Sequence, residues 1–195
     1  MYNKLKKIKT AIFISGKGSN MESLIRAASS KKFPAIIALI ITDNELAQGI
    51  RLAKNYKIAT KILDKKKFNK LQFEAESQKV LLSYKIEIIC LAGFMKILSK
   101  EFIGLWQNKI INIHPSYLPK NKGLNPQKQV LDEKSSFTGC TVHFVNEKVD
   151  DGKIILQKKV KILQNDDVQT LSNRILQKEH KIYPKALNQI ASNMI

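Results

Sequence analysis

The sequence has few cysteines, few arginines and no long apolar run, and each shortage excludes a class of protein. Two cysteines among 195 residues, Cys90 and Cys140, are too few for a disulfide scaffold, so we expect a reducing compartment. No apolar run approaches the length of a membrane span, and residues 11–14 are too short for a secretory signal. We therefore expect a soluble, cytoplasmic protein that does not bind membranes.

Arginine is scarce although the chain is strongly basic. The formal net charge is +18, yet only three of the 34 basic residues are arginines, namely Arg26, Arg51 and Arg174. Base reading and two-point phosphate binding favour arginine, and the lysines are not interleaved with aromatic residues as a single-strand platform requires. The composition therefore favours a solvated basic surface that attracts small polyanions over a nucleic-acid-binding module. That module remains an alternative, and it predicts steeply salt-dependent binding to an oligonucleotide.

Apolar, β-rich segments alternate with helical patterns along the first 114 residues. This alternation is typical of a parallel sheet with helices on both of its faces. The expected strands span residues 10–15, 35–42, 59–63, 86–92 and 109–114. The expected helices span residues 19–29, 45–55, 68–83 and 99–106. Ser19 followed by Glu22 predicts a capping box at the start of the first helix.

The pattern changes after residue 114. Residues 115–126 contain three prolines and a glycine and predict a loop. Two more strands, at 138–146 and 154–162, suggest an antiparallel addition to the sheet. A last helix is expected over 167–183, ended by Pro184. The predicted fold class is α/β, a mostly parallel, open, Rossmann-like sheet with helices on both faces and an antiparallel C-terminal strand addition.

A glycine-containing turn over residues 14–20 joins the first expected strand to the first helix. Backbone N–H groups at a helix N-terminus form a ready anion site. The dinucleotide fingerprint needs a third glycine where Met21 stands, so a single phosphate is the better ligand, with Ser19 and Asn20 as added donors. A capped strand–helix turn without any ligand explains the same residues equally well. A further alternative is a non-catalytic protein that uses this turn only to bind a phosphate or nucleotide.

Asn112 and His114 lie two residues apart at the end of an expected strand. Such residues point to the same side of a sheet, while Ile113 between them turns into the core. Pro115 ends the strand pairing, which places both side chains at the carboxyl end, where open α/β sheets bind ligands. An amide donor beside an imidazole suits acyl transfer, because one stabilises an oxyanion and the other donates or moves a proton. A strand end with two satisfied polar groups is the simpler alternative.

An acidic turn, residues 149–152, is ordinarily only a turn. If Asp150 lay close to His114, its carboxylate would raise the imidazole pKa and orient the ring. His143 lies on an expected strand and faces either a pocket or water, and Glu179 lies late in the last helix. The three histidines have no metal-ligand spacing with either cysteine, so we expect no metal.

Five segments together resemble the glycinamide ribonucleotide formyltransferases, and they occur in the family's order over nearly the whole chain. The segments are ISGKGSNMESLI near the start, LAGFMKILS at 91–99, INIHPSYLPKNKGL at 111–124, GCTVHFVNEKVDDGKIILQ at 139–157 and QKEHKIYP at 177–184. The resemblance implies the formyltransferase fold. It also implies an enzyme of de novo purine biosynthesis that transfers the formyl group of 10-formyltetrahydrofolate to the amine of 5'-phosphoribosylglycinamide. The folate would be a co-substrate, and the reaction would pass through an oxyanion-stabilised tetrahedral intermediate.

The resemblance also implies roles for individual residues. The catalytic residues would be Asn112, His114 and Asp150. The substrate phosphate would bind to Gly18, Ser19 and Asn20. The folate would contact Met95, Lys96, Ile97, Leu98, Asn112, Val149 and Asp150. Glu179 would receive the substrate amine.

The expected organisation is one domain over residues 1–195, with a phosphate-binding half at 1–100 and a folate-binding and catalytic half at 101–195. Its partners would be small molecules, and the protein would be a monomer or homodimer. Residues 122–127 depart from the family pattern, which puts substrate contacts there in doubt. Formyltetrahydrofolate hydrolase or another folate-dependent formyltransferase is the alternative activity. A hydrolase would carry an N-terminal regulatory domain, and a tRNA formyltransferase a basic C-terminal domain.

Overall fold

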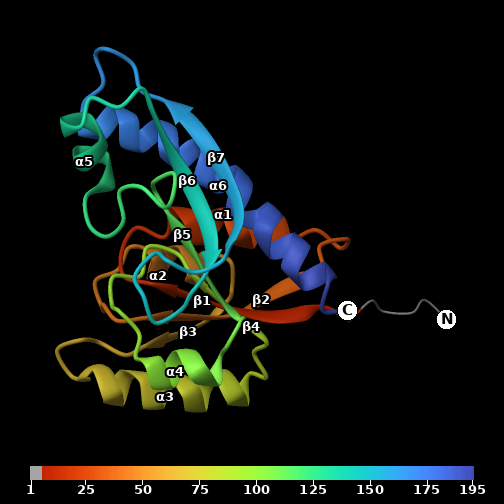
Figure 1. The fold of residues 1–195 in the computed structure, drawn as a ribbon. Helices are drawn as coiled ribbons and strands as arrows, with labels where there is room; N and C mark the ends of the chain where they lie inside the picture. The colour runs from red at the N-terminus through yellow and green to blue at the C-terminus, as the bar shows by residue number, and fades with distance from the viewer. Residues whose placement is uncertain (1–5) are drawn as a thin grey trace.

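The computed structural model describes residues 6–195, so residues 1–5 of the expected domain lie outside the described residues. The strands are β1 (Ile8–Ile14), β2 (Ala35–Thr42), β3 (Ala59–Ile62), β4 (Ile88–Leu91), β5 (Ile110–His114), β6 (Phe137–Phe144) and β7 (Ile154–Lys161). The helices are α1 (Ser19–Ala28), α2 (Gly49–Asn55), α3 (Lys70–Ser83), α4 (Lys100–Leu105), α5 (Pro126–Asp132) and α6 (Val168–Ser192). The strands form one seven-stranded sheet in the order β3-β2-β1-β4-β5-β6-β7 (Figure 1).

The first five strands are parallel, and the last two are antiparallel additions. β1 pairs in parallel with β2 and β4, and β4 pairs in parallel with β5. β6 is antiparallel to β5, and β7 is antiparallel to β6. β4 is apolar and buried along its whole length, and β1 is apolar and buried from Ala11 onward, because helices cover both of their faces. The predicted fold class, including the antiparallel strand pair, is confirmed.

The order of the strands reverses between β1 and β4. From β1 the chain runs outward to β2 and β3 and then returns to place β4 on the other side of β1. The two loops that leave the carboxyl ends of β1 and β4 therefore run in opposite directions. A crevice forms between such loops, and ligands of open α/β sheets bind there.

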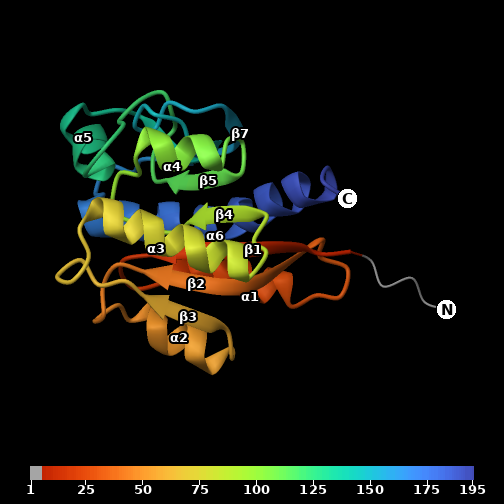
Figure 2. The same cartoon turned by 90° about the horizontal axis from the view of Figure 1, so that it is seen from below.

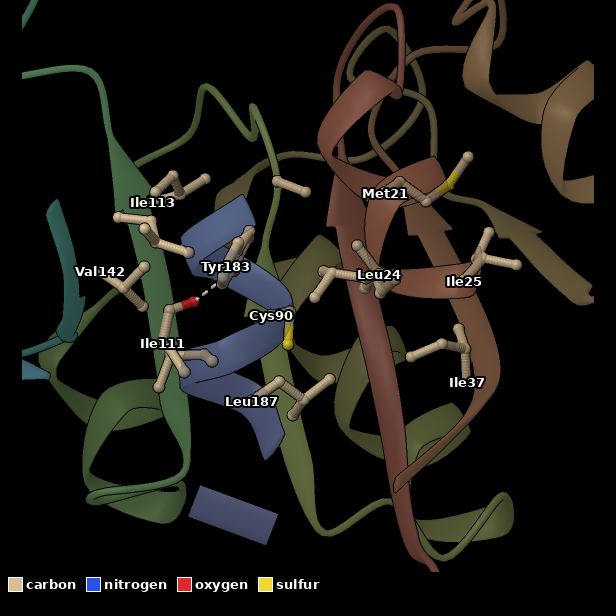
Figure 3. Packing of buried hydrophobic residues seen from close by; sticks show 14 of the residues in the cluster. Met21, Leu24, Ile25, Ile37, Cys90, Ile111, Ile113, Val142, Tyr183 and Leu187 are labelled. Carbon is tan, nitrogen blue, oxygen red and sulfur yellow. Dashed lines mark hydrogen bonds between the residues drawn. The ribbon is translucent and has the colours of Figure 1, made fainter. Parts of the chain in front are cut away.

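Two hydrophobic cores fix the sheet between its helices. On one face, α1 and α6 cover a core in which Met21, Leu24 and Leu187 are fully buried. On the other face, α3 and α4 cover a second core, and they lie in front of the sheet in Figure 2. The Tyr183 hydroxyl on α6 lies 2.9 Å from the Leu91 carbonyl oxygen and 3.1 Å from that of Ile111, as Figure 3 shows for Ile111. α6 is thereby tied to the middle of the sheet.

The predicted end of the last helix is wrong, because α6 runs through Pro184 and continues to Ser192. A proline inside a helix lacks the N–H that would bond four residues back, and this ordinarily ends or kinks the helix. Here the residues beyond it, Ala186, Leu187 and Ala191, are fully buried in the core. Their burial offsets the missing hydrogen bond.

Three other local predictions need correction. No side-chain capping box starts α1, because the N-cap residue is Gly18 in the left-handed region and Ser19 is already helical. Glu22 pairs with Arg26 one turn later instead. α2 starts at Gly49 rather than at residue 45, and α5 was not expected at all. Pro126 stands at the first turn of α5, where a missing N–H costs nothing.

Candidate active site

The loop after β1 lies against the start of α2 because two glycines allow close approach. The Gly49 N–H donates to the Gly16 carbonyl oxygen at 3.1 Å. Gly18 has φ +79, and a Cβ added to it would lie 2.9 Å from the Cα of Gly49. The loop then enters α1 at Ser19, so the first N–H groups of that helix face the crevice end of the sheet.

Ser15 joins this loop to the segment that follows β4. Its N–H donates to the Gly93 carbonyl oxygen at 3.1 Å, and its Oγ accepts from the Met95 N–H at 3.0 Å. The Asn44 side-chain amide donates to the Ser15 carbonyl oxygen at 3.0 Å. The predicted phosphate loop and the predicted folate segment therefore share one serine as a common support.

The side chains of the predicted folate segment differ in exposure. Met95 and Ile97 are exposed, whereas Leu98 is buried in the core beside α4, which leaves only its main chain available to a ligand. The Lys96 ammonium lies 4.7 Å from the centroid of the Phe73 ring. Val149, from the distant turn before β7, is also exposed. Exposed apolar side chains of this kind suit a flat aromatic ligand.

Asn112, His114 and Asp150 come together at the carboxyl end of β5. Asn112 and His114 point to one side of the sheet while Ile113 packs into the α1–α6 core, as predicted. The Asp150 carboxylate Oδ2 lies 3.2 Å from His114 Nδ1 and accepts from the Gly123 N–H at 2.9 Å. Asp150 itself has φ +51, a region that few residues other than glycine adopt and that is common at functional sites.

His114 is buried, and burial is the largest influence on its charge. Burial lowers the pKa of His114 below its ordinary value of 6.5, and the Asn121 carbonyl and the Asp150 carboxylate only partly oppose this. The Asp150 carboxylate raises the imidazole pKa, as predicted, but burial, which the prediction did not include, outweighs it. Burial also tends to raise the pKa of Asp150, but the adjacent His143 ring, the hydrogen bond from the Gly123 N–H and the nearby His114 ring hold that pKa below its ordinary value.

Two partners of the trio were not identified from the sequence. His143 on β6 is buried, and its Nε2 lies 3.3 Å from Asn112 Nδ2 and 3.5 Å from Asp150 Oδ1. The Asn121 carbonyl oxygen lies 2.9 Å from His114 Nε2. The register of β6 on β5 places His143 opposite Asn112, and the sequence pattern alone did not fix that register.

Glu179 and Asn20 form a second polar pair, between α6 and the start of α1. The Asn20 amide donates to the Glu179 carboxylate at 2.6 Å. Burial raises the pKa of Glu179, and this hydrogen bond acts in the opposite direction. The other Asn20 side-chain atom, Oδ1, is buried and finds no hydrogen-bond partner among residues 6–195. A buried acceptor without a donor, Asn20 Oδ1, thus lies beside a buried carboxylate.

The remaining candidates give no further site. Both cysteines are free and buried, and burial raises the pKa of Cys140 to about 12. Among residues 6–195 no group of three or more histidine, cysteine or acidic side chains is arranged to hold a metal ion. None of the helices in that range is long and apolar enough to cross a membrane.

Comparisons with known proteins agree with this geometry. A model of the formyl transferase family matches residues 8–187. The phosphoribosylglycinamide formyltransferase of Haemophilus influenzae is 40% identical over 177 residues, which cover 90% of this chain and 84% of that protein. The crystal structure of the Brucella melitensis phosphoribosylglycinamide formyltransferase superposes with a TM-score of 0.92 at 43% identity, covering 97% of this chain and 98% of that one.

Some relatives are much longer than this chain. The trifunctional purine biosynthetic protein adenosine-3 of Gallus gallus is 43% identical over 190 residues, but the chain spans only 19% of that protein's length. Glycinamide ribonucleotide transformylase 1 of Symbiobacterium toebii superposes with a TM-score of 0.95 at 34% identity, covering 99% of this chain and 92% of that one. The matched model, the sequence identities and the common fold together show that the chain belongs to the formyl transferase family, as its resemblance to the glycinamide ribonucleotide formyltransferases predicts.

Proposed function

We propose that this protein transfers the formyl group of 10-formyltetrahydrofolate to the amine of 5'-phosphoribosylglycinamide in de novo purine synthesis. The observation that carries the proposal is the meeting of Asn112, His114 and Asp150 at the crevice end of β5. Asp150 comes from a distant turn to meet two polar side chains of one strand end, at the same edge of the parallel sheet as the predicted phosphate-binding turn after β1. This combination suits acyl transfer to a phosphorylated acceptor.

The polar groups around the crevice fit the two ends of the ribonucleotide. Its phosphate would bind to the N–H groups and side chains of Gly18, Ser19 and Asn20 at the start of α1. Its amine end would meet the Glu179 carboxylate and the unpartnered oxygen of Asn20. Because Asn20 belongs to both regions, one side chain would set the spacing between phosphate and amine.

The folate would bind where the β4 loop and the turn at Asp150 meet the end of β5. Leu91 and Asn112 are register partners on β4 and β5, so residues 95–98 emerge close to the trio. Met95, Ile97 and Val149 offer exposed apolar surface, and main-chain groups of 95–98 offer hydrogen bonds. A flat, polar-edged ring system needs both features.

In the proposed reaction, the neutral amine nitrogen bonds to the formyl carbon, and the bond from that carbon to the folate nitrogen then breaks. The formyl oxygen becomes an oxyanion in the tetrahedral intermediate, where an Asn112 N–H donates to it. The amine loses one proton, and the departing folate nitrogen gains one. His114, uncharged in the free protein because of its burial, accepts the proton that the amine loses and passes it to the folate nitrogen as that bond breaks. To donate to the oxyanion in between, its Nε2 must exchange the Asn121 carbonyl oxygen for the formyl oxygen. Asp150 orients the ring and stabilises its charged form.

An assay that follows both products tests this function. The purified protein is incubated with 10-formyltetrahydrofolate in the presence and absence of 5'-phosphoribosylglycinamide, and formylated ribonucleotide and free formate are measured separately. We expect ribonucleotide-dependent transfer with little formate. Formate release that does not need the ribonucleotide would instead favour the hydrolase alternative, in which water replaces the amine.

A further inference from the structure

His143 stands directly opposite Asn112 across the antiparallel pair of β5 and β6. Side chains of residues paired in this way extend from the same face of the sheet and lie close together. His143 is only 2% exposed, and its Nε2 lies 3.3 Å from the Asn112 amide nitrogen. A buried imidazole is therefore in contact with the group that is proposed to stabilise the oxyanion.

The direction of this hydrogen bond follows from the other side of the ring. His143 Nδ1 lies 2.8 Å from the Phe144 carbonyl oxygen, which can only accept, so Nδ1 carries a proton. In the neutral ring, Nε2 is then an acceptor, and its partner must be a donor. The Asn112 NH2 group meets this requirement, whereas the Asp150 oxygen at 3.5 Å is a more distant acceptor.

This hydrogen bond decides which end of the Asn112 amide occupies which position. A primary amide has two N–H bonds, so one can be held by His143 while the other remains directed into the crevice. Turned by half a rotation, the amide would present its oxygen to His143 Nε2, and two acceptors would face each other. In that orientation the amide oxygen and the NH2 group would have exchanged positions, so no N–H would be directed into the crevice as it is now.

We propose that His143 is a positioning residue that accepts a hydrogen bond from Asn112 and so keeps an amide N–H directed at the formyl oxygen. The inference deepens the proposed function and rests on it. His143 does not itself need to touch either substrate. Its effect should therefore appear in kcat, because the oxyanion forms only during reaction, and not in the binding of the ribonucleotide or the folate.

Two substitutions separate hydrogen bonding from packing. His143→Phe keeps a planar ring but removes the acceptor, whereas His143→Gln keeps an acceptor at the end of a flexible side chain. We expect His143→Phe to lower kcat by about tenfold to a hundredfold, less than the loss typical of deleting an oxyanion donor outright. Both KM values should stay within about twofold. His143→Gln should recover most of the lost turnover, and thermal unfolding checks that both variants are folded.

A spectroscopic measurement tests the contact without relying on turnover. The side-chain amide resonances of Asn112, assigned by their loss in Asn112→Ala, should shift and exchange faster with solvent in His143→Phe than in the wild-type protein or His143→Gln. Unchanged Asn112 resonances, a folded His143→Phe with wild-type kcat, or equal losses in the Phe and Gln variants would each overturn the inference. If the wild-type protein transfers no formyl group, the proposed function fails, while the resonances still report whether His143 holds the amide.

Discussion

Asn112 and His114 have different surroundings although they share one strand end. Asn112 is partly exposed and keeps an N–H free for a ligand, whereas both nitrogens of the buried His114 ring face protein acceptors, Asp150 on one side and Asn121 on the other. A neutral imidazole has one proton to share between two acceptors. If the His114 ring takes up a second proton, both of its N–H groups have an acceptor, one in Asp150 and the other in Asn121.

Replacing either side chain should therefore remove most of the activity. We expect Asn112→Ala and His114→Ala each to lower kcat by about a hundredfold to a thousandfold, the range found for single oxyanion-hole donors. Steady-state kinetics with both substrates measures the loss, and thermal unfolding shows whether the fold persists. A folded variant with wild-type turnover would exclude the replaced residue from the mechanism.

The burial of His114 also leads to a prediction about how its charge and the stability of the fold depend on pH. Because burial lowers the pKa of His114, the ring should stay neutral in the folded protein at pH values where an exposed histidine is already half protonated. An unfolded chain takes up that proton near the ordinary value, so His114 makes folding less stable as pH falls below 6.5. The Cε1 proton resonance of His114, assigned with His114→Gln, should titrate below 6.5. A midpoint at or above that value would contradict the prediction.

At the scale of elements, the loop after β1 depends on the absence of a side chain at the start of α2. A Cβ at Gly49 would lie 2.5 Å from Ile14 Cδ1 and 3.3 Å from the Gly16 carbonyl oxygen, so the Ile14 side chain would have to shift and the loop at Gly16 would have to give way slightly. The N–H groups that are proposed to bind the substrate phosphate lie at the end of this loop. Their position is therefore sensitive to the packing of a helix that itself contributes no predicted ligand-binding residue.

The substitution Gly49→Ala tests this dependence, with Gly104→Ala as its matched control. We expect Gly49→Ala to cost about 1–3 kcal/mol of stability, as overpacking does, and to raise KM for the ribonucleotide more than KM for the folate. A Cβ at Gly104, inside α4, meets nothing within 4 Å, so this change should stabilise the protein by about 0.5–1 kcal/mol. Denaturant unfolding measures the change in stability, and steady-state kinetics measures both KM values. Equal effects of Gly49→Ala and Gly104→Ala would show that the loop does not depend on the missing side chain at Gly49.

The elements that the sequence predicts well are those whose own residues determine them. The strand at Ala35–Thr42 matches the prediction because an apolar run of this kind is stable where helices cover both faces of the sheet, and within it only Ile36 is exposed. α6 differs, because a proline signals an end locally, whereas Ala186 and Leu187 pack against residues far away in the sequence. The start of α1 differs for a similar reason, since Gly18 takes the capping position through its contact with Gly49.

At the scale of the whole molecule, the excess of lysine creates a positive electrostatic field around the protein. A net charge of +18 repels itself in the compact state and attracts anions such as phosphates. Salt screens both effects, since the Debye length falls to about 10 Å at 0.1 M. Stability and substrate binding should thus respond to salt in opposite directions.

We expect the unfolding temperature to rise, and KM for the phosphorylated substrate also to rise, as sodium chloride increases from 20 to ~300 mM. Differential scanning fluorimetry and initial rates measure the two effects on the same samples. An unfolding temperature that falls with salt would show that attractive ion pairs outweigh the repulsion. Steep loss of affinity for an oligonucleotide over the same range would instead support the nucleic-acid-binding alternative.

By itself, the sequence determined the alternation of strands and helices, the sheet with helices on both faces and the strand end that carries Asn112 and His114, because the periodicity of apolar residues is a local property. The five family segments also identified the enzyme family from residues alone. Only the tertiary structure placed Asp150 within 3.2 Å of His114 and His143 opposite Asn112. It also decided that burial outweighs the nearby carboxylate in setting the His114 pKa. Distance, strand register and desolvation depend on how distant segments pack, and no single segment encodes them.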